Sequence, residues 1–439
     1  MSQPQDTSPQ HQVDPLELSA AAVNHLIQIL PAGTAYFIGI VLVIMMTGRL
    51  AQCKGSLARA VFPLVWWLKW GWHRVERAME RGKVSVDELL ERSFNWCVDI
   101  LPVEPVLMGE QQRTVHAIDS STIARWRAKL GMDLLGKGYD HRAGKAIKGN
   151  IIAIVTMVVF IAGVRVGLVR RLKFGDSCED AVAKVFQDLP KSEGKRLVVV
   201  DAGIATKQQF ADSTDKDALL GRLRINCKLR CAPPPPPPLK PGAGRPPIHG
   251  PELRPGSDTP EVEPDQQVSI RVSNGILRVR RWNQLHFEEH AETLLDVVRI
   301  DHPDYDKPLL IGTVARELTT GQMWASYSHR SPVETNFFVG QDTAAMEMPR
   351  AWTQNAIERR IGLALLVGYV LKAIAAVCQP LPMGPWDRKP QRTAGRLANY
   401  LDIRVHNFMA LALKGVKPIN YRKIQSPQGT SDVPLPEAV

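Results

Sequence analysis

Three acidic residues that are far apart in the chain have the types and settings needed for metal-dependent chemistry. Asp119 and Asp201 each follow a strand-like apolar run, and Glu334 lies at the start of a predicted helix. Tyr327 and Arg330 precede Glu334 in a Y-x2-R-x3-E spacing. Two carboxylates from strand ends and one from a helix could hold a pair of divalent ions for phosphodiester chemistry.

The helix that carries Glu334 can be placed from its own signals. Ser331 is the predicted N-cap, Pro332 is the first helical residue and Glu334 is three residues after the cap. Ser-x-x-Glu is also a capping box, in which Glu334 would only bond the backbone of Ser331. Gln341, seven residues further on, shares the helix face of Glu334.

The elements that must position the aspartates form an α/β pattern. Val- and Ile-rich runs predict strands, and a helix separates the third strand from the fourth. The predicted strands are 115–118, 147–161, 164–172 and 197–200, and the helix is 178–189. This order predicts a ribonuclease-H-like mixed sheet with helices, in which Asp119 and Asp201 emerge close together.

The rest of the chain divides by composition into parts around this sheet. We expect an all-α N-terminal domain, a catalytic domain in two parts separated by a proline-rich and β-rich insertion, and a C-terminal helical segment. The predicted ranges are 1–105 for DNA binding or dimerisation with the first ~15 residues disordered, 106–228, 229–321, 322–380, and 381–439 with a disordered tail.

Within the insertion, the dipeptide at 274–275, Asn-Gly, predicts a β-hairpin. A two-residue turn there pairs Val272 with Leu277 and Ile270 with Val279, so one face is apolar. The opposite face carries Arg271 and Arg278. These arginines could contact DNA phosphates, and an ordinary solvated face fits them equally well.

Charge and cysteine usage narrow the class of protein. The 439 residues carry a formal net charge of +11, which favours a polyanionic partner such as nucleic acid. The six cysteines are scattered, and the close pair Cys227 and Cys231 lacks further ligands for zinc, so a reducing cytoplasm fits best. The N-terminus lacks the basic region of a signal peptide.

Residues 26–48 contain no charged side chain and are long enough to cross a bilayer. Polar residues, Gly and Pro dilute the segment, and the apolar run 361–378 contains Lys372. We therefore expect buried helices and no membrane, and a membrane-associated protein is the less favoured alternative.

His286, Glu289 and His290 spell H-x-x-E-H, an inverted zinc-peptidase pattern. The match is short and lies inside the insertion. A peptidase would also leave Asp119 and Asp201 unexplained, so we set this interpretation aside.

The motif residues together resemble the DDE transposases of bacterial insertion sequences, in the branch marked by Y-x2-R-x3-E-x6-K. The resemblance covers most of the chain and includes the segment 221–224 and the proline-rich stretch after it. It implies that Asp119, Asp201 and Glu334 are the catalytic residues and hold two Mg²⁺ ions, with Mn²⁺ as a substitute. It further implies that Tyr327 and Arg330 hold the transposon-end strand.

The resemblance also implies partners. These are double-stranded DNA with terminal inverted repeats, a target duplex and a second copy of the chain, all in the cytoplasm at the nucleoid. Trp282, just after the hairpin, is a candidate to stack on a flipped base. Gln341 stands where the family has lysine, which removes a charge at the phosphate. A catalytically impaired DNA-binding derivative is therefore the alternative function.

Overall fold

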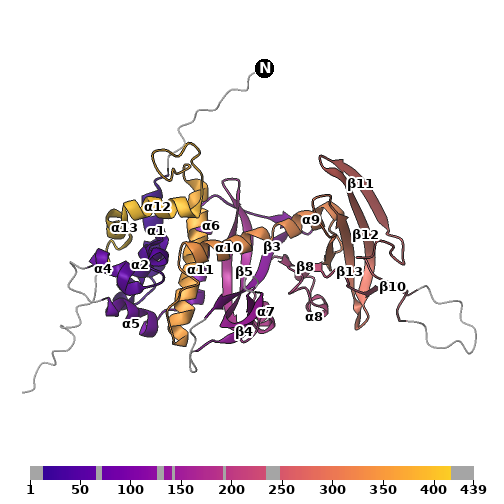
Figure 1. The fold of residues 1–439 in the computed structure, drawn as a ribbon, viewed down its shortest axis with the longest axis horizontal. Helices are drawn as coiled ribbons and strands as arrows, with labels where there is room; N and C mark the ends of the chain where they lie inside the picture. Colours follow the sequence, from indigo (N-terminus) through magenta and orange to yellow (C-terminus); the bar gives the residue numbers. More distant parts are fainter. Residues whose placement is uncertain are drawn as a thin grey trace, which may run out of the picture.

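The computed structural model describes residues 13–65, 72–125, 133–140, 144–190, 194–233 and 248–416. A helical part lies at one end of the elongated molecule, a β-rich part lies at the other, and the central strands lie between them (Figure 1). The predicted disordered ends fall on residues 1–12 and 417–439, and the polyproline run falls largely on 234–247. These segments lie outside the described residues.

The central strands form a mixed sheet in the order β6-β5-β3-β7-β8. Strands β3, β5 and β6 form an antiparallel meander, whereas β7 and β8 run parallel to β3. Their bounds are β3 Arg113–Ala124, β5 Lys145–Ile161, β6 Val164–Gly175, β7 Arg196–Val200 and β8 Asp217–Leu223, with short flanking strands β1 Val103–Pro105, β2 Leu107–Met108 and β4 Gly136–Asp140. The predicted α/β class and these core strands are confirmed.

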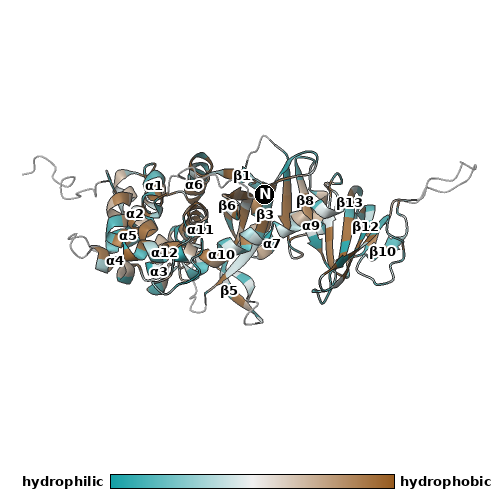
Figure 2. Ribbon diagram, turned by 90° about the horizontal axis from the view of Figure 1, so that it is seen from above, coloured by the Kyte–Doolittle hydropathy of each residue, from teal (hydrophilic) through white to brown (hydrophobic). Residues whose placement is uncertain are grey.

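Both faces of the sheet are buried, which explains the continuous runs of Val and Ile. Ile151, Ala153 and Val155 of β5 share a cluster with the helix α7 (Cys178–Gln187). Ile152 and Ile154 alternate with them and pack into the other cluster, together with the long helices. Figure 2 shows the predominantly apolar character of these central strands.

The β-rich part continues the central sheet instead of forming a separate one. Its last strand, β14, pairs antiparallel with β8, and β13, β12 and β11 follow in turn. The strands are β9 Leu229–Arg230, β10 Glu252–Leu253, β11 Gln266–Val272, β12 Gly275–Phe287, β13 His290–Asp301 and β14 Leu309–Thr313. The expected strands are therefore confirmed mainly in residues 266–313 of the predicted insertion.

The hairpin between β11 and β12 forms, but its predicted register was wrong. Val272 pairs with Gly275, and Ile270 pairs with Leu277, so the turn is Ser273-Asn274. The shift is by two residues, which keeps the same side chains on each face. Only the β12 side of the apolar face is covered: Leu277 is buried, whereas Ile270 is 48% exposed on the edge strand.

The described residues of the segment 13–100 are mostly helical, as expected, but they do not form a core of their own. Its helices α1, α2, α5 and α6 pack around α11, and α13 packs on α1 and α2. The helices are α1 Pro15–Ile27, α2 Ala32–Met46, α3 Arg49–Gln52, α4 Leu57–Val65, α5 His73–Arg81, α6 Val86–Ile100, α11 Gln354–Val377, α12 Ala394–Ile403 and α13 Val405–Ala412. The two ends of the chain thus build one helical part.

The apolar segment 26–48 becomes the end of α1, a turn at residues 28–30 and α2, whose residues 35–46 are all buried. Among the described residues, α11 is the one helix that is long and apolar enough to cross a membrane. However, 89% of its most apolar window is buried inside the protein. This burial is consistent with a soluble protein.

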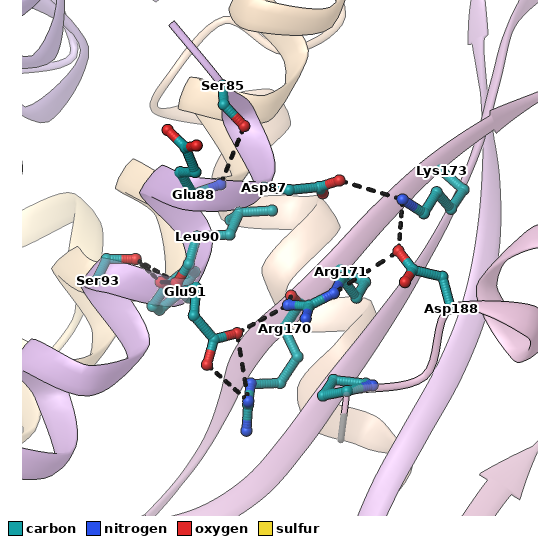
Figure 3. Close-up of polar contacts among 12 residues, drawn as sticks. Ser85, Asp87, Glu88, Leu90, Glu91, Ser93, Arg170, Arg171, Lys173 and Asp188 are labelled. Carbon is teal, nitrogen blue, oxygen red and sulfur yellow. Dashed lines mark hydrogen bonds and ion pairs between the residues drawn. The ribbon is translucent and has the colours of Figure 1, made fainter. Parts of the chain in front are cut away.

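Ion pairs fix the helical part to the sheet at α6 and β6. Arg170 donates to Glu91 at 2.9 Å, and Lys173 lies between Asp87 at 3.1 Å and Asp188 at 2.6 Å (Figure 3). Because Asp188 follows α7, the same lysine links helices on opposite faces of the sheet. Ion pairs therefore connect the central sheet to helices on both of its faces.

Candidate active site

The two aspartates lie side by side because of the strand register. Ala117 of β3 pairs with Val199 of β7 in parallel, and each aspartate follows its own member of this pair by two residues. Asp201 is the first residue after β7, whereas β3 continues beyond Asp119 to Ala124 along β5. Asp119 was predicted to lie at the end of a strand, but it lies where the pairing of β3 with β7 ends. This position brings its carboxylate next to that of Asp201.

Glu334 is carried to the same place by a pair of consecutive helices, α9 (Thr320–Ser328) and α10 (Ser331–Asp342). The predicted N-cap was wrong: Ser331 is already helical, and Arg330 precedes it in an αR conformation without a side-chain cap. The reason is that α9 runs almost directly into α10, which leaves no extended residue to cap the second helix. Glu334 consequently forms no capping box.

The guanidinium of Arg330 contacts all three carboxylates. Its Nη2 lies 3.5 Å from Asp119 Oδ2 and 3.7 Å from Asp201 Oδ2, and its Nη1 donates to Glu334 Oε1. Since both aspartate oxygens lie within 3.7 Å of one nitrogen, they lie within about twice that distance of each other. The structure thus brings together the three acidic residues predicted from the sequence.

Asp201 has further partners that hold it ionised. The hydroxyl of Tyr327 donates to Asp201 Oδ1 at 2.9 Å, and Nη1 of Arg222 lies 4.0 Å from the same oxygen. Burial raises the pKa of Asp201, but a hydrogen bond from the Ala202 amide, the charge of Arg330 and the Tyr327 hydroxyl outweigh it. The pKa of Asp201 is therefore below its ordinary value.

Asp119 has the opposite electrostatic setting. Burial raises its pKa from 3.8 to about 6, although Arg330 and the amide of Ser120 act against this rise. Burial also raises the pKa of Tyr327 to about 12, with the neighbouring Asp201 as the second cause. Burial lowers the pKa of Arg330, but its carboxylate neighbours more than reverse that effect. The site therefore pairs a readily ionised carboxyl group with one that is reluctant to ionise.

A cavity of about 620 Å³ opens beside the carboxylates. Glu334, Tyr327 and Arg330 line it together with Arg222, Lys307 and Trp324, among others. Sequence reasoning missed these last three residues. Arg222 lies in the segment 221–224 that the family resemblance had highlighted, whereas no local signal marks Lys307 or Trp324.

The donor set of this site suits Mg²⁺, which prefers carboxylate oxygens. The described residues include no group of three or more His, Cys, Asp or Glu side chains placed to hold an ion as they stand. In this structure the guanidinium of Arg330 provides the positive charge between the carboxylates. Binding of Mg²⁺ would require Arg330 to leave that position.

The other predicted DNA-binding residues are not among those that line the cavity. Gln341 is partly buried on α10, and Arg271 and Arg278 are exposed on β11 and β12. Trp282 is 1% exposed, and its indole N–H donates to the carbonyl of Val262 at 3.0 Å. A side chain buried in this way has no face free for a flipped base, so the structure corrects that expectation.

The H-x-x-E-H residues do not gather into a metal site in the described part of the chain. His286 is buried, and its Nε2 lies 3.0 Å from His249 Nδ1. Glu289 instead forms an ion pair with Lys207 at 2.5 Å.

No protein-family model matches the chain, and no curated protein matches it.

Proposed function

We propose that this protein is a DDE transposase that cleaves the ends of an insertion sequence in a metal-dependent reaction and joins them to target DNA. The observation that carries the proposal is the convergence of Asp119, Asp201 and Glu334 on the single guanidinium of Arg330. Three carboxylates that share one cation at the edge of a cavity form a site with affinity for positive charge.

The fold supports the same proposal. The order β6-β5-β3-β7-β8, with three antiparallel strands followed by two parallel ones, agrees with the expected ribonuclease-H-like layout. In that layout the aspartates belong to adjacent parallel strands, and here they occupy equivalent positions in register.

Asp119, Asp201 and Glu334 would hold two Mg²⁺ or Mn²⁺ ions. When bound, such ions activate a water molecule for in-line attack and stabilise the leaving 3′ oxygen. The chain itself supplies orientation and charge around the phosphodiester. Arg330 would exchange its carboxylate contacts for a phosphate, which a guanidinium can bind through two parallel hydrogen bonds.

Arg222 and Lys307 line the cavity wall and could contact phosphates there, although Asp304 and Asp306 lie in the same wall. Tyr327 orients Asp201 through its hydroxyl group. The partners in this proposal are double-stranded DNA with terminal inverted repeats and a target duplex. Two copies of the chain would act on the paired ends, and the reaction would take place at the nucleoid in the cytoplasm.

The test is incubation of the purified protein with Mg²⁺ or Mn²⁺ and a duplex that carries the inverted repeats flanking its gene. Asp201→Ala should abolish cleavage and retain DNA binding. Asp212→Asn, which removes an exposed carboxylate at the end of α8 (Lys207–Ala211), is the matched control and should cleave normally. Equal cleavage by wild type and Asp201→Ala would rule out this site as the catalytic centre.

Gln341 favours a second candidate, a DNA-binding derivative with impaired catalysis. Glutamine can donate a hydrogen bond to a phosphate oxygen but lacks charge assistance. This candidate predicts binding of the repeats without cleavage, and cleavage that appears when Gln341→Lys restores the cation. If the wild-type protein cleaves as well as Gln341→Lys, the second candidate fails.

A further inference from the structure

A second cavity, of about 630 Å³, lies in the helical part between the start of α2 and the helix α5. Its lining is strongly basic: Arg74, Arg77, Arg81 and Lys83. The residues Phe37 and Ala78 form part of its apolar wall. We call this cavity the basic groove, and it shares no lining residue with the cavity beside the carboxylates.

The basic residues of α5 are sorted onto one side of the helix. Arg74, Arg77 and Arg81 follow one another at helical spacing, whereas Val75, Ala78 and Met79 are buried. Glu76 and Glu80 of the same helix do not line the groove, and their charges act on the buried guanidinium of Arg360 in α11. The lining that α5 contributes is therefore basic and apolar, without a carboxylate.

Three of the four basic side chains that line the groove have no acidic partner among the described residues. Arg77, Arg81 and Lys83 are exposed, and none of them forms an ion pair with another described residue. The wall opposite α5 includes Gly33 and Thr34 in the first turn of α2. That turn contains no acidic residue and has no side-chain cap, so its backbone dipole adds to the positive potential.

We propose that the basic groove binds the phosphate backbone of double-stranded DNA, as a contact separate from the carboxylate site. The inference rests on the proposed function for the choice of DNA as the partner, but it does not depend on catalysis. Arg77 and Arg81 are four residues apart, about 6 Å along the helix axis, which is close to the spacing of neighbouring phosphates of one strand. Guanidinium groups bind phosphate oxygens in pairs, and such contacts fix the position of a duplex without reading its sequence.

The experiment measures binding of the full-length protein to a fluorescent random-sequence duplex by anisotropy, with EDTA present, across a series of NaCl concentrations. The triple variant Arg77→Gln, Arg81→Gln and Lys83→Gln should bind at least about tenfold more weakly. Its plot of log affinity against log salt should be shallower by about 2 to 3, because each lost phosphate contact removes roughly 0.9 from the slope.

A second triple variant removes the same charge elsewhere, at the exposed residues Lys54, Lys216 and Lys228, each changed to Gln. It should lose much less affinity and keep the wild-type slope. If the two triple variants have equal affinities and slopes, the groove does not bind DNA. Thermal unfolding of both variants checks that these exposed positions leave the fold intact.

Vesicles of phosphatidylserine provide the other anionic surface. If the groove variant lost binding to these vesicles but kept its affinity for the duplex, the proposal would be overturned in favour of a lipid surface. Asp201→Ala separates this inference from the proposed function, because it should retain groove-dependent binding. A protein that cleaves no DNA would still support the inference if the groove variant alone lost duplex affinity.

Discussion

The hydroxyl of Tyr327 donates a hydrogen bond of 2.9 Å to Oδ1 of Asp201. This bond joins α9 to the end of β7 and is independent of the contacts of Arg330. It is one of the interactions that keep the pKa of Asp201 below its ordinary value. The site is thus organised by a neutral donor and by cations.

Removal of this hydroxyl should raise the pKa of Asp201 and weaken the fold. We expect Tyr327→Phe to lose about 1 kcal/mol of unfolding free energy at pH 7, a reduced value because Asp201 is 35% exposed. Because the pKa of Asp201 is lowered in the folded protein, the ionised carboxylate stabilises the fold. The loss caused by Tyr327→Phe should therefore shrink as the pH falls and Asp201 becomes protonated. Urea unfolding at pH 3 and pH 7 measures the difference, and an equal loss at both would contradict the assignment.

Asp119 should lower the stability of the fold at neutral pH, whereas Asp201 raises it. Its folded pKa of about 6 lies above the ordinary 3.8, so burial of the ionised form costs free energy at neutral pH. We expect Asp119→Asn to stabilise the metal-free protein by up to about 3 kcal/mol above pH 6. The gain should shrink as the pH falls and vanish below about pH 4.

Urea unfolding in EDTA across this pH range is the measurement for Asp119→Asn. The exposed control Asp212→Asn should show no such gain at neutral pH. A destabilised Asp119→Asn at pH 8 would mean that its contact with Arg330 outweighs the cost of burial.

Arg330 should stabilise the protein most when no metal is present. Replacement by Gln leaves three carboxylates facing one another with no cation between them, although Arg222 still lies 4.0 Å from Asp201. We expect a loss of about 2–4 kcal/mol in EDTA. Mg²⁺ should recover part of this loss, so the rise in Tm on adding Mg²⁺ should be larger for Arg330→Gln than for wild type. Thermal unfolding with and without Mg²⁺ checks this, and equal rises in the two proteins would show that metal does not bind between these carboxylates.

Trp282 should be important for the fold and not for direct DNA contact. Trp282→Ala should cost about 3–5 kcal/mol, because it empties a buried site and removes the donor to Val262. Trp282→Phe keeps most of the volume and should cost less, with DNA affinity unchanged. The measurement is duplex binding by the folded Trp282→Phe protein. A large loss of affinity would indicate that Trp282 contacts DNA.

The parts of the site that sequence could predict are those encoded locally. The short apolar runs before Asp119 and Asp201 signal buried strands, and Pro332 signals the start of a helix. The N-cap at Ser331 could not be predicted correctly, because the proximity of α9 decides whether the residue before it is extended. A local pattern also says nothing of which distant cations, such as Lys307, face the site.

Local sequence patterns also could not predict which side chains are buried in the β-rich part. Trp282 reads as a surface tryptophan after a basic hairpin, and only the fold of residues 248–265 shows that Val262 covers it. The contacts of helix α11 span the greatest distance along the chain. This helix packs against N-terminal helices that lie more than 250 residues earlier and completes their hydrophobic core.

The pairing of β14 with β8 has a practical consequence for shortened versions of the protein. Strand β8 has β7 on one side, so without β14 its other side would present unbonded N–H and C=O groups. Such an open strand recruits strands from other molecules and promotes aggregation. A variant that deletes residues 229–308 but keeps Leu309–Thr313 should therefore remain far more soluble than one that removes those five residues as well.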